Sequence, residues 1–369
     1  MHVRRVIAAV LAVGACVGCA PMRFGDSDAP FIIERAEFLG TIAGPWTAQA
    51  EVLAQDGAGS FAVPGGSVWL FGDTFLGTRN ASGEPVYNGG RSCTAALLAS
   101  DATDFPPQLH YVVGEDGRAS NPFSLFDDEP EERFRIWPGG AIAVGGRYYV
   151  FYDRVEITGP GPWGFLPSGA GLARGLEPLG PFERLRHGRD WQYPLMPHQI
   201  IEEGGLLYLF AAAEWHGARG VLLARVAAES IEDPSAYIYY TGPGPRFSTN
   251  RDDAQLLIDE VYGQVSIAWN DYLGAYLMAC SSDFFHPHAV RFRVADALCG
   301  PWRAPVAEVI VPETQGPTDL VYCAYLHPEW SQDGGRGIAI SYCPMLKHGF
   351  AMPEMVRLTL RRTSPRVAD

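Results

Sequence analysis

The chain has 369 residues, of which 47% are hydrophobic and 19% are charged, which is the composition of a globular protein with a large core. Its 42 acidic residues outnumber its 28 basic residues, and the formal net charge at pH 7 is −14. Because nucleic acids and anionic membranes are bound by clustered Lys and Arg, this balance argues against both ligands and favours a neutral one.

The N-terminus has the pattern of an export signal. Arg4 and Arg5 form a basic head, and the apolar run at 6–17 is too short to span a membrane comfortably in a mature protein. The small-residue segments ending at Cys16 and Cys19 resemble the lipobox of bacterial lipoproteins. This resemblance implies a mature chain that begins on an acylated cysteine, with Cys19 preferred, and a plain secretory peptide is the alternative. We therefore expect a protein that is exported and is either lipid-anchored to the cell envelope or secreted.

A tight turn followed by an apolar run recurs along the chain. Four copies carry Gly-Gly and a looser one carries Asn-Asp, at residues 63–74, 143–154, 202–215, 269–282 and 332–343. Because the central residues of a two-residue β-turn need a positive φ, each copy predicts a hairpin with a second strand before the turn.

The strand after each turn is apolar on both faces. In the first copy Val68 and Leu70 lie on one face, and Trp69 and Phe71 on the other. Such a strand must be covered on both sides, as adjacent blades of a propeller do. A doubly wound parallel sheet would also cover both faces, but no convincing helical pattern separates the strands, and 42 Gly and 29 Pro interrupt them.

The spacing of the copies, roughly 60 to 80 residues, suits a four-stranded blade with loops. We therefore predict an all-β fold, a five-bladed β-propeller at 37–362. The flanking stretches are then a lipoprotein-type signal peptide at 1–19, a linker at 20–36 and a tail at 363–369. A second motif, Gly-Pro-aromatic, recurs at 180–182 and 300–302 and indicates outer strands. Its third occurrence, at 44–46, suggests that the N-terminal segment contributes to the closing blade.

Three successive copies end on an acid, namely Asp73, Asp153 and Glu214. The ends of all the post-turn strands share the rim opposite the turns, so the propeller brings these acids together. A carboxylate at the end of a buried strand is costly unless it is paired or functional. Paired carboxylates are what hydrolysis of a glycosidic bond needs, one as the acid and the other as base or nucleophile. We expect Asp73 and Asp153 to be the principal catalytic carboxylates; caps or ion pairs are the alternative.

Other rim residues are candidates for binding a sugar. Aromatic rings offer flat apolar faces, and polar side chains offer hydrogen bonds to hydroxyl groups. The candidates are Trp137, Arg154, His198, Trp215, Asn270 and Asp319. The Gly- and Pro-rich stretch 159–171 predicts a long rim loop that walls a cleft. No metal or other cofactor is predicted, although a central structural ion is left open. The mature chain has no CxxC spacing, which argues against a cysteine zinc site. We expect the protein to be a monomer.

Five cysteines follow the signal segment, and in an oxidising compartment some could pair. Cys280 with Cys299 and Cys323 with Cys343 are possible disulfides, and the odd number leaves Cys93 or another cysteine free. The connectivity stays open at the level of sequence.

The motifs SVWLFGDTF, GPF, GPW, YLMACSS and HPEWSQDGGRGIAISY resemble a bacterial five-bladed propeller family long filed as a domain of unknown function. Its characterised members are endo-acting D-arabinanases that cut mycobacterial cell-wall arabinan, and the resemblance extends from about residue 40 to 360. In the broader group of arabinanase and fructosidase propellers, successive blades contribute an Asp, an Asp and a Glu to the centre. The resemblance implies these roles for Asp73, Asp153 and Glu214, although the segment AAAEW around Glu214 departs from the expected acidic motif.

The sequence therefore predicts a glycoside hydrolase acting on a furanose-containing polysaccharide or oligosaccharide, most similar to the endo-D-arabinanases. Two hypotheses of other classes stay open: a non-catalytic carbohydrate-binding propeller on the cell surface, and a scaffold with a degenerate site.

Overall fold

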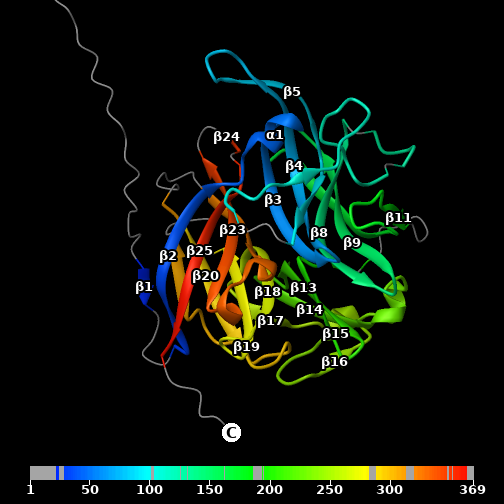
Figure 1. Ribbon diagram of the computed structural model, residues 1–369. Coiled ribbons are helices and arrows are strands. Elements are labelled where there is room, and N and C mark those ends of the chain that lie inside the picture. Colours follow the sequence, from blue (N-terminus) through cyan, green and yellow to red (C-terminus); the bar gives the residue numbers. More distant parts are fainter. Residues whose placement is uncertain are drawn as a thin grey trace, which may run out of the picture.

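The computed structural model describes residues 22–24, 29–100, 104–124, 126–130, 132–161, 163–185, 193, 195–281, 288–312, 320–346, 349–350 and 352–363. In these parts the chain forms five antiparallel sheets around a common axis, which confirms the predicted five-bladed β-propeller (Figure 1). The α-helix α1 (Pro45–Gln49) is short. Short 3-10 helices lie in the connections at Ala228–Ser230, Pro234–Ala236, Arg251–Asp253, Pro328–Trp330 and Asp333–Gly335.

The sheets are numbered as blades in chain order, and their strands are given from the axis outward. Blade 1 consists of β3 (Val52–Val63), β4 (Gly66–Arg79), β6 (Thr94–Ala99) and β7 (His110–Tyr111), with β5 (Pro85–Arg91) paired to β4. Blade 2 consists of β8 (Phe134–Val144), β9 (Arg147–Ile157), β10 (Phe165–Gly175) and β11 (Glu183–Leu185). Blade 3 consists of β12 (Gln199–Glu203), β13 (Leu206–Trp215), β14 (Ala218–Ala227), β15 (Ile238–Tyr240) and β16 (Phe247–Ser248), with β17 (Leu256–Asp259) paired to β14.

Blades 4 and 5 both take an outer strand from the N-terminal segment. Blade 4 consists of β18 (Tyr262–Asn270), β19 (Ala275–Ser281), β20 (Ala289–Ala295), β21 (Ala307–Ile310) and β1 (Met22–Phe24). Blade 5 consists of β22 (Leu320–Leu326), β23 (Gly337–Leu346), β25 (Glu354–Arg362) and β2 (Phe31–Thr41), with β24 (Gly349–Phe350) paired to β23.

The innermost strands form a closed ring around the axis. Each of β3, β8, β12, β18 and β22 contacts the next one, and β22 contacts β3. These are the strands expected before each turn, so the start of every blade faces the centre of the molecule.

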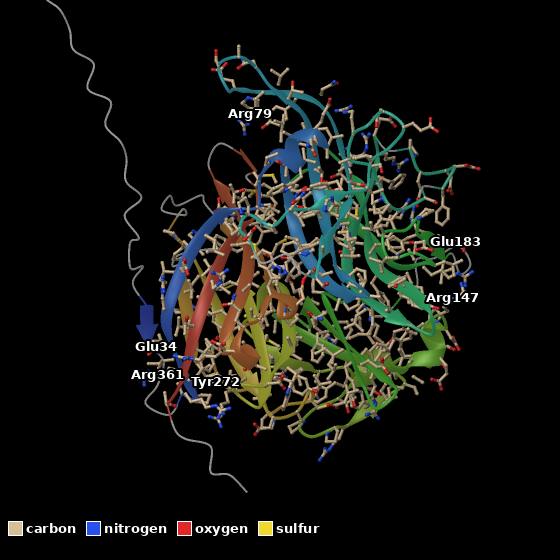
Figure 2. The ribbon with its side chains drawn as sticks, in the orientation of Figure 1. Glu34, Arg79, Arg147, Glu183, Tyr272 and Arg361 are labelled. Carbon is tan, nitrogen blue, oxygen red and sulfur yellow. The ribbon has the colours of Figure 1, made fainter. Side chains whose placement is uncertain are left out.

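The N-terminal strand β2 closes the ring as the outer strand of blade 5. It pairs with β25, where Ile33 lies opposite Leu360, and Glu34 forms an ion pair with Arg361 at 3.6 Å (Figure 2). This confirms that the N-terminal segment contributes to the closing blade. β2 begins at Phe31, inside the stretch 20–36 assigned to a linker, and the Gly-Pro-Trp motif at 44–46 leads into α1 instead of a strand.

Hydrophobic packing between neighbouring blades explains why the post-turn strands are apolar on both faces. On β4, Val68 and Leu70 pack with blade 2, whereas Trp69 and Phe71 pack with residues of blade 5. All four are almost fully buried. Burial of a large apolar side chain contributes about 1.5–3 kcal/mol relative to exposure, so the packing between blades is a main source of stability.

The predicted two-residue turns form in the first three copies, at 64–65, 145–146 and 204–205, whereas four residues, 271–274, join the strands of the fourth copy. Gly145 and Gly146 connect β8 to β9 with φ values of 57° and 74°, which a side chain disfavours. The fifth copy does not form such a turn, because β22 ends at Leu326 and β23 begins only at Gly337.

In that longer connection, His327 joins blade 5 to blade 1. Its ring stacks on Trp69 with centroids 4.2 Å apart and is within 2.8 Å of the hydroxyls of Ser60 and Ser341. The sequence HPEW therefore folds around a buried contact between two blades, which a tight turn could not provide.

The five cysteines after the signal segment are free in the structure. Cys323 and Cys343 belong to one small buried cluster, and Cys280 packs in a larger one with Cys299 at its edge. In the part of the chain that the structure describes, no helix is both long and apolar enough to cross a bilayer. The export signal and Cys19 lie outside the described residues, and acylation there stays a prediction.

Candidate active site

A cavity of about 280 Å³ lies where the inner strands converge on the axis. It is bounded by residues from blades 1, 2, 4 and 5 and by the segment before β12. The polar side chains that line it include Asp56, Asp73, Asp153, His198, Gln264 and Tyr322. Three carboxyl groups from two neighbouring blades thus meet in one cavity, as expected for Asp73 and Asp153.

Asp56 is the functional candidate that the sequence reasoning missed. It lies on β3, in an irregular stretch between the pairs Gln55 with Thr74 and Gly57 with Phe71, which places it beside Asp73 on β4. A Cβ atom on Gly72 would lie 2.4 Å from Oδ1 of Asp56, so any side chain at that position would displace the Asp56 carboxyl group. The length of the first strand was the feature that could have identified Asp56. A strand that begins at residue 52 carries Asp56 to the rim of the cavity.

Two donors hold the Asp56 carboxyl group in place. The Tyr322 hydroxyl donates a hydrogen bond to Oδ2 at 3.1 Å, and the backbone N–H of Asp73 donates another. Burial and the nearby charge of Asp73 raise the pKa of Asp56 to about 7, in spite of these two hydrogen bonds. Asp56 is therefore an acid that can still hold its proton near neutral pH.

Asp73 has surroundings that favour its ionised form more strongly. The Trp137 indole donates from Nε1 to Oδ1 of Asp73 at 2.9 Å, and the positive charge of Arg135 is close. Burial raises the pKa of Asp73 above its usual value, and these two contacts offset part of that rise. Asp56 and Asp73 titrate as a coupled pair, and we infer that Asp73 loses its proton first. In this order of titration, Asp56 is the group that keeps its proton to the higher pH.

Asp153 is the third carboxyl group of the cavity. It lies opposite Trp137 in the pairing of β9 with β8, so the two side chains share one face of the sheet, and both line the cavity. Burial raises its pKa to about 7, and among the described residues no donor forms a hydrogen bond with its carboxylate. Its oxygens are therefore available to a ligand in the cavity.

His198 is positioned as a neutral hydrogen-bond donor. The backbone N–H of Ala212 donates to Nδ1 at 3.1 Å, so the proton of the neutral imidazole is on Nε2. Burial lowers the pKa of His198 to about 4, and the ring stays neutral at physiological pH. His198 and Trp137 both line the cavity, as expected for binding residues.

Glu214 does not join the carboxyl cluster, and its predicted position is wrong. The backbone N–H of His198 bonds to the carbonyl of Phe210, so β13 passes the level of the cavity near Phe210. The strand continues as a hairpin with β14, where Glu214 lies opposite Arg219. Its side chain is 64% exposed and 3.7 Å from the Arg219 guanidinium. Because the residues just before Glu214 are alanines, the sequence does not show that the strand extends past the cavity.

Two further candidates have structural partners that keep them out of the cavity. Arg154 contacts Glu129 at 2.6 Å and lies over the Phe134 ring, on the other face of β9 from Asp153. Trp215 donates from Nε1 to the carbonyl of Ala254 at 2.8 Å and packs between blades. Both assignments to sugar binding are therefore wrong.

Asn270 is also misplaced in the prediction, because it belongs to the turn at the opposite end of blade 4. Its side chain accepts from the N–H of Leu273 and donates to the carbonyl of Gly335, each at 2.8 Å. It caps a turn, whereas the cavity lies at the other rim.

The last candidate, Asp319, lies outside the described residues.

The expected rim loop does wall the site. Trp163 lies in the connection from β9 to β10, and Phe165 is the first residue of β10. Both line the cavity together with Trp137. The rings of Trp137 and Phe165 pack edge to face with centroids 4.8 Å apart. Within the described residues, no group of three or more His, Cys, Asp or Glu side chains is arranged to hold a metal ion.

A sequence profile described as a domain of unknown function, DUF4185, matches residues 52–342 of the chain, which include blades 1 to 3, blade 4 without β1, and part of blade 5. The chain belongs to the DUF4185 family. Comparison with curated proteins finds no match.

Solved structures with low sequence identity share the fold of this DUF4185 protein. A suspected hydrolase from Bacteroides ovatus aligns with a TM-score of 0.59 and 18% identity, covering 94% of this chain and 97% of that chain. A family 117 glycoside hydrolase, Zg3597 from the marine bacterium Zobellia galactanivorans, aligns with a TM-score of 0.53 and 12% identity, covering 93% and 94%. Similarity at this level concerns the fold, and the chemistry must come from the residues of the cavity.

The raised pKa of Asp153 predicts a pH-dependent gain in stability for Asp153→Asn in this DUF4185 protein. A carboxyl group whose pKa is higher in the folded state stabilises the fold fully below pH 4, and this contribution is lost as the pH rises through 7. Because Asn cannot ionise, the variant should become more stable than the wild type by on the order of 3 kcal/mol at pH 8. Urea unfolding of both proteins between pH 4 and pH 8 measures this difference. A difference that does not change with pH would contradict it.

Proposed function

We propose that the protein is a glycoside hydrolase whose catalytic carboxyl groups are Asp56 and Asp73. The observation that carries the proposal is the pair of buried carboxyl groups at the propeller axis, which line one cavity and have different partners. Tyr322 donates to Asp56, whose pKa is raised to about 7, whereas Trp137 donates to Asp73 and the charge of Arg135 favours its ionised form. Neighbouring carboxyl groups whose environments separate their pKa values supply the acid and the base of glycoside hydrolysis.

In this proposal each aspartate has one role in bond cleavage. Asp56 gives its proton to the glycosidic oxygen as the bond to the anomeric carbon breaks. Asp73, as a carboxylate, either takes a proton from the attacking water or attacks the anomeric carbon itself. The Trp137 indole fixes Oδ1 of Asp73, and Tyr322 fixes Asp56, so both groups are held before the substrate binds.

The remaining polar groups of the cavity suit recognition of a sugar. Asp153 can accept hydrogen bonds from hydroxyl groups, and the Nε2–H of His198 can donate one to a hydroxyl oxygen. The indole of Trp137 and the ring of Phe165 offer apolar surfaces to the sugar ring. These features support a neutral carbohydrate as the ligand.

We further propose that the substrate is a furanose-containing polysaccharide, with D-arabinan first. Support comes from the resemblance to the endo-D-arabinanase group in the motifs around Asp73 and in the later blades. The shared fold with a family 117 glycoside hydrolase supports the reaction class alone.

Release of oligosaccharides from D-arabinan, L-arabinan and fructans, measured by mass spectrometry, tests the proposed function. We expect products from one furanose polymer and none after substitution of the catalytic pair. If no polymer is cut but a glycan array shows binding that Asp73→Asn does not change, the protein is a carbohydrate-binding propeller and the proposal is wrong.

A further inference from the structure

A second and larger cleft, of about 970 Å³, adjoins the cavity at the axis. The two hollows share Asp73, Trp137 and Phe165 as lining residues, so they form one continuous surface with Asp73 at the junction. A sugar bound next to Asp73 therefore has an open path along which the rest of a chain can extend.

The outer wall of this cleft is the hairpin of β4 and β5, which projects from the body of the molecule (Figure 1). In Figure 2 the label of Arg79, at the end of β4, marks this projection. Tyr87 on β5 lines the cleft with 58% of its surface exposed, and its ring packs edge to face on Phe75 with centroids 6.0 Å apart. An aromatic ring with so much free surface contributes little to a core, but it can stack on the apolar face of a sugar.

The inner end of the cleft is also aromatic. Trp137 contacts Phe165, and Phe165 in turn lies 6.5 Å from the ring of Trp163, which is 64% exposed. Gly159, Gly161 and Gly164, on either side of Trp163 in the chain, also line the cleft. Aromatic surfaces thus stand at both ends of the path, near Asp73 and at Tyr87.

The two arginines that line the cleft have acidic neighbours, and Glu132 adds a further negative charge to its lining. Arg91 lies 3.4 Å from Asp116, and Arg135 is close to the negative charge of Asp73. A polyanion would need uncompensated positive charge, whereas a neutral polyhydroxylated chain needs apolar faces and a few hydrogen bonds. The volume of the cleft, near the upper end of the usual range of about 300–1,000 Å³ for ligand sites, suits several sugar units.

We propose that this cleft binds the part of a neutral polysaccharide chain that extends beyond the central cavity, with Tyr87 as its outer sugar-stacking residue. The inference rests on the proposed function for the identity of the ligand. Tyr87 makes the site prefer long chains over short ones, and it does so without touching the bond that is cleaved.

Affinity electrophoresis in gels containing D-arabinan, L-arabinan or a fructan tests this inference independently of hydrolysis. The proteins compared are Asp73→Asn, which keeps the polymer intact, and the same protein with Tyr87→Ala or Val86→Ala added. Val86 is the matched control, because it is the preceding residue of β5, is 49% exposed and lines neither hollow. We expect Tyr87→Ala to weaken binding to the retarding polymer about tenfold, and Val86→Ala to leave it unchanged.

Oligosaccharides of increasing length, titrated against the same proteins by calorimetry, locate the contact along the chain. With Asp73→Asn alone, affinity should rise with length until the chain reaches Tyr87, and the last part of that rise should be missing after Tyr87→Ala. Equal retardation of the Tyr87→Ala and Val86→Ala proteins would overturn the inference, as would a failure of every polymer to retard Asp73→Asn. If the proposed function is wrong, the polymer stays intact after incubation with the wild-type protein, and this result is independent of the binding measurements.

Discussion

Asp73→Asn should abolish hydrolysis of the susceptible polymer, lowering kcat/KM at least about a thousandfold. An amide can neither take a proton from water nor act as a carboxylate nucleophile, and the ionised member of the carboxyl pair is lost. Oligosaccharide release, measured by mass spectrometry at a fixed pH between 5 and 7, gives the rate for the variant and the wild type.

The fold should survive this substitution, because Asn has the shape of Asp and its side-chain oxygen can still accept from Nε1 of Trp137. The thermal midpoint of Asp73→Asn should therefore stay close to that of the wild type. Asp116→Asn is a suitable control, since this exposed acid contacts Arg91 but lines neither the cavity nor the cleft. A large fall in the midpoint of Asp73→Asn would mean that Asp73 stabilises the blade, and the catalytic assignment would be wrong.

The architecture was predictable from sequence because it depends on patterns that repeat. Each blade must bury both faces of its second strand, which forces the apolar run exemplified by Trp69 and Phe71 on β4. Tight turns need positive φ, which fixes glycine at positions such as Gly145 and Gly146. These requirements hold at every blade, and so they leave a repeating signal in the sequence.

The site was predictable only where its residues follow the same repeat. Asp73 and Asp153 lie at the level of the cavity on the second strands of blades 1 and 2, both of which continue past them, and counting from the turn finds them. Glu214 was misplaced because β13 continues past that level in a hairpin with β14. Strand length beyond a rim is decided by the partner strand, and the local sequence carries no record of it.

Asp56 was missed for a related reason. It lies in a bulged stretch of β3, where the register with β4 shifts. The alternating apolar pattern is broken there, so the sequence alone does not show that the strand continues. The contact that identifies it, with the hydroxyl of Tyr322, joins residues from the first and last blades. Pairings that depend on the closure of the ring become visible only once the fold is known.

Asp56→Asn should lower hydrolysis of the polymer by about a hundredfold to ten-thousandfold, because the proton donor for the leaving group is removed. The loss should be much smaller for aryl glycosides of the cleavable oligosaccharide, whose leaving groups depart without protonation. Comparison of kcat/KM on the two kinds of substrate measures this difference. Asp153→Asn is the control, since Asp153 is assigned to hydroxyl binding and should affect both substrates alike.

The pH dependence of the rate gives a second test of Asp56. An acid must be protonated to act, so a donor with a pKa of about 7 makes the wild-type rate fall as the pH rises through 7. The hydrogen bond from Tyr322 lowers the pKa of Asp56, and Tyr322→Phe should therefore move this fall to higher pH. The residual activity of Asp56→Asn should not fall as the pH rises through 7. If the fall persists in Asp56→Asn and disappears in Asp153→Asn, whose carboxyl group also has a pKa of about 7, then Asp153 is the proton donor. The pair of Asp56 and Asp73 would in that case serve to position and tune the base.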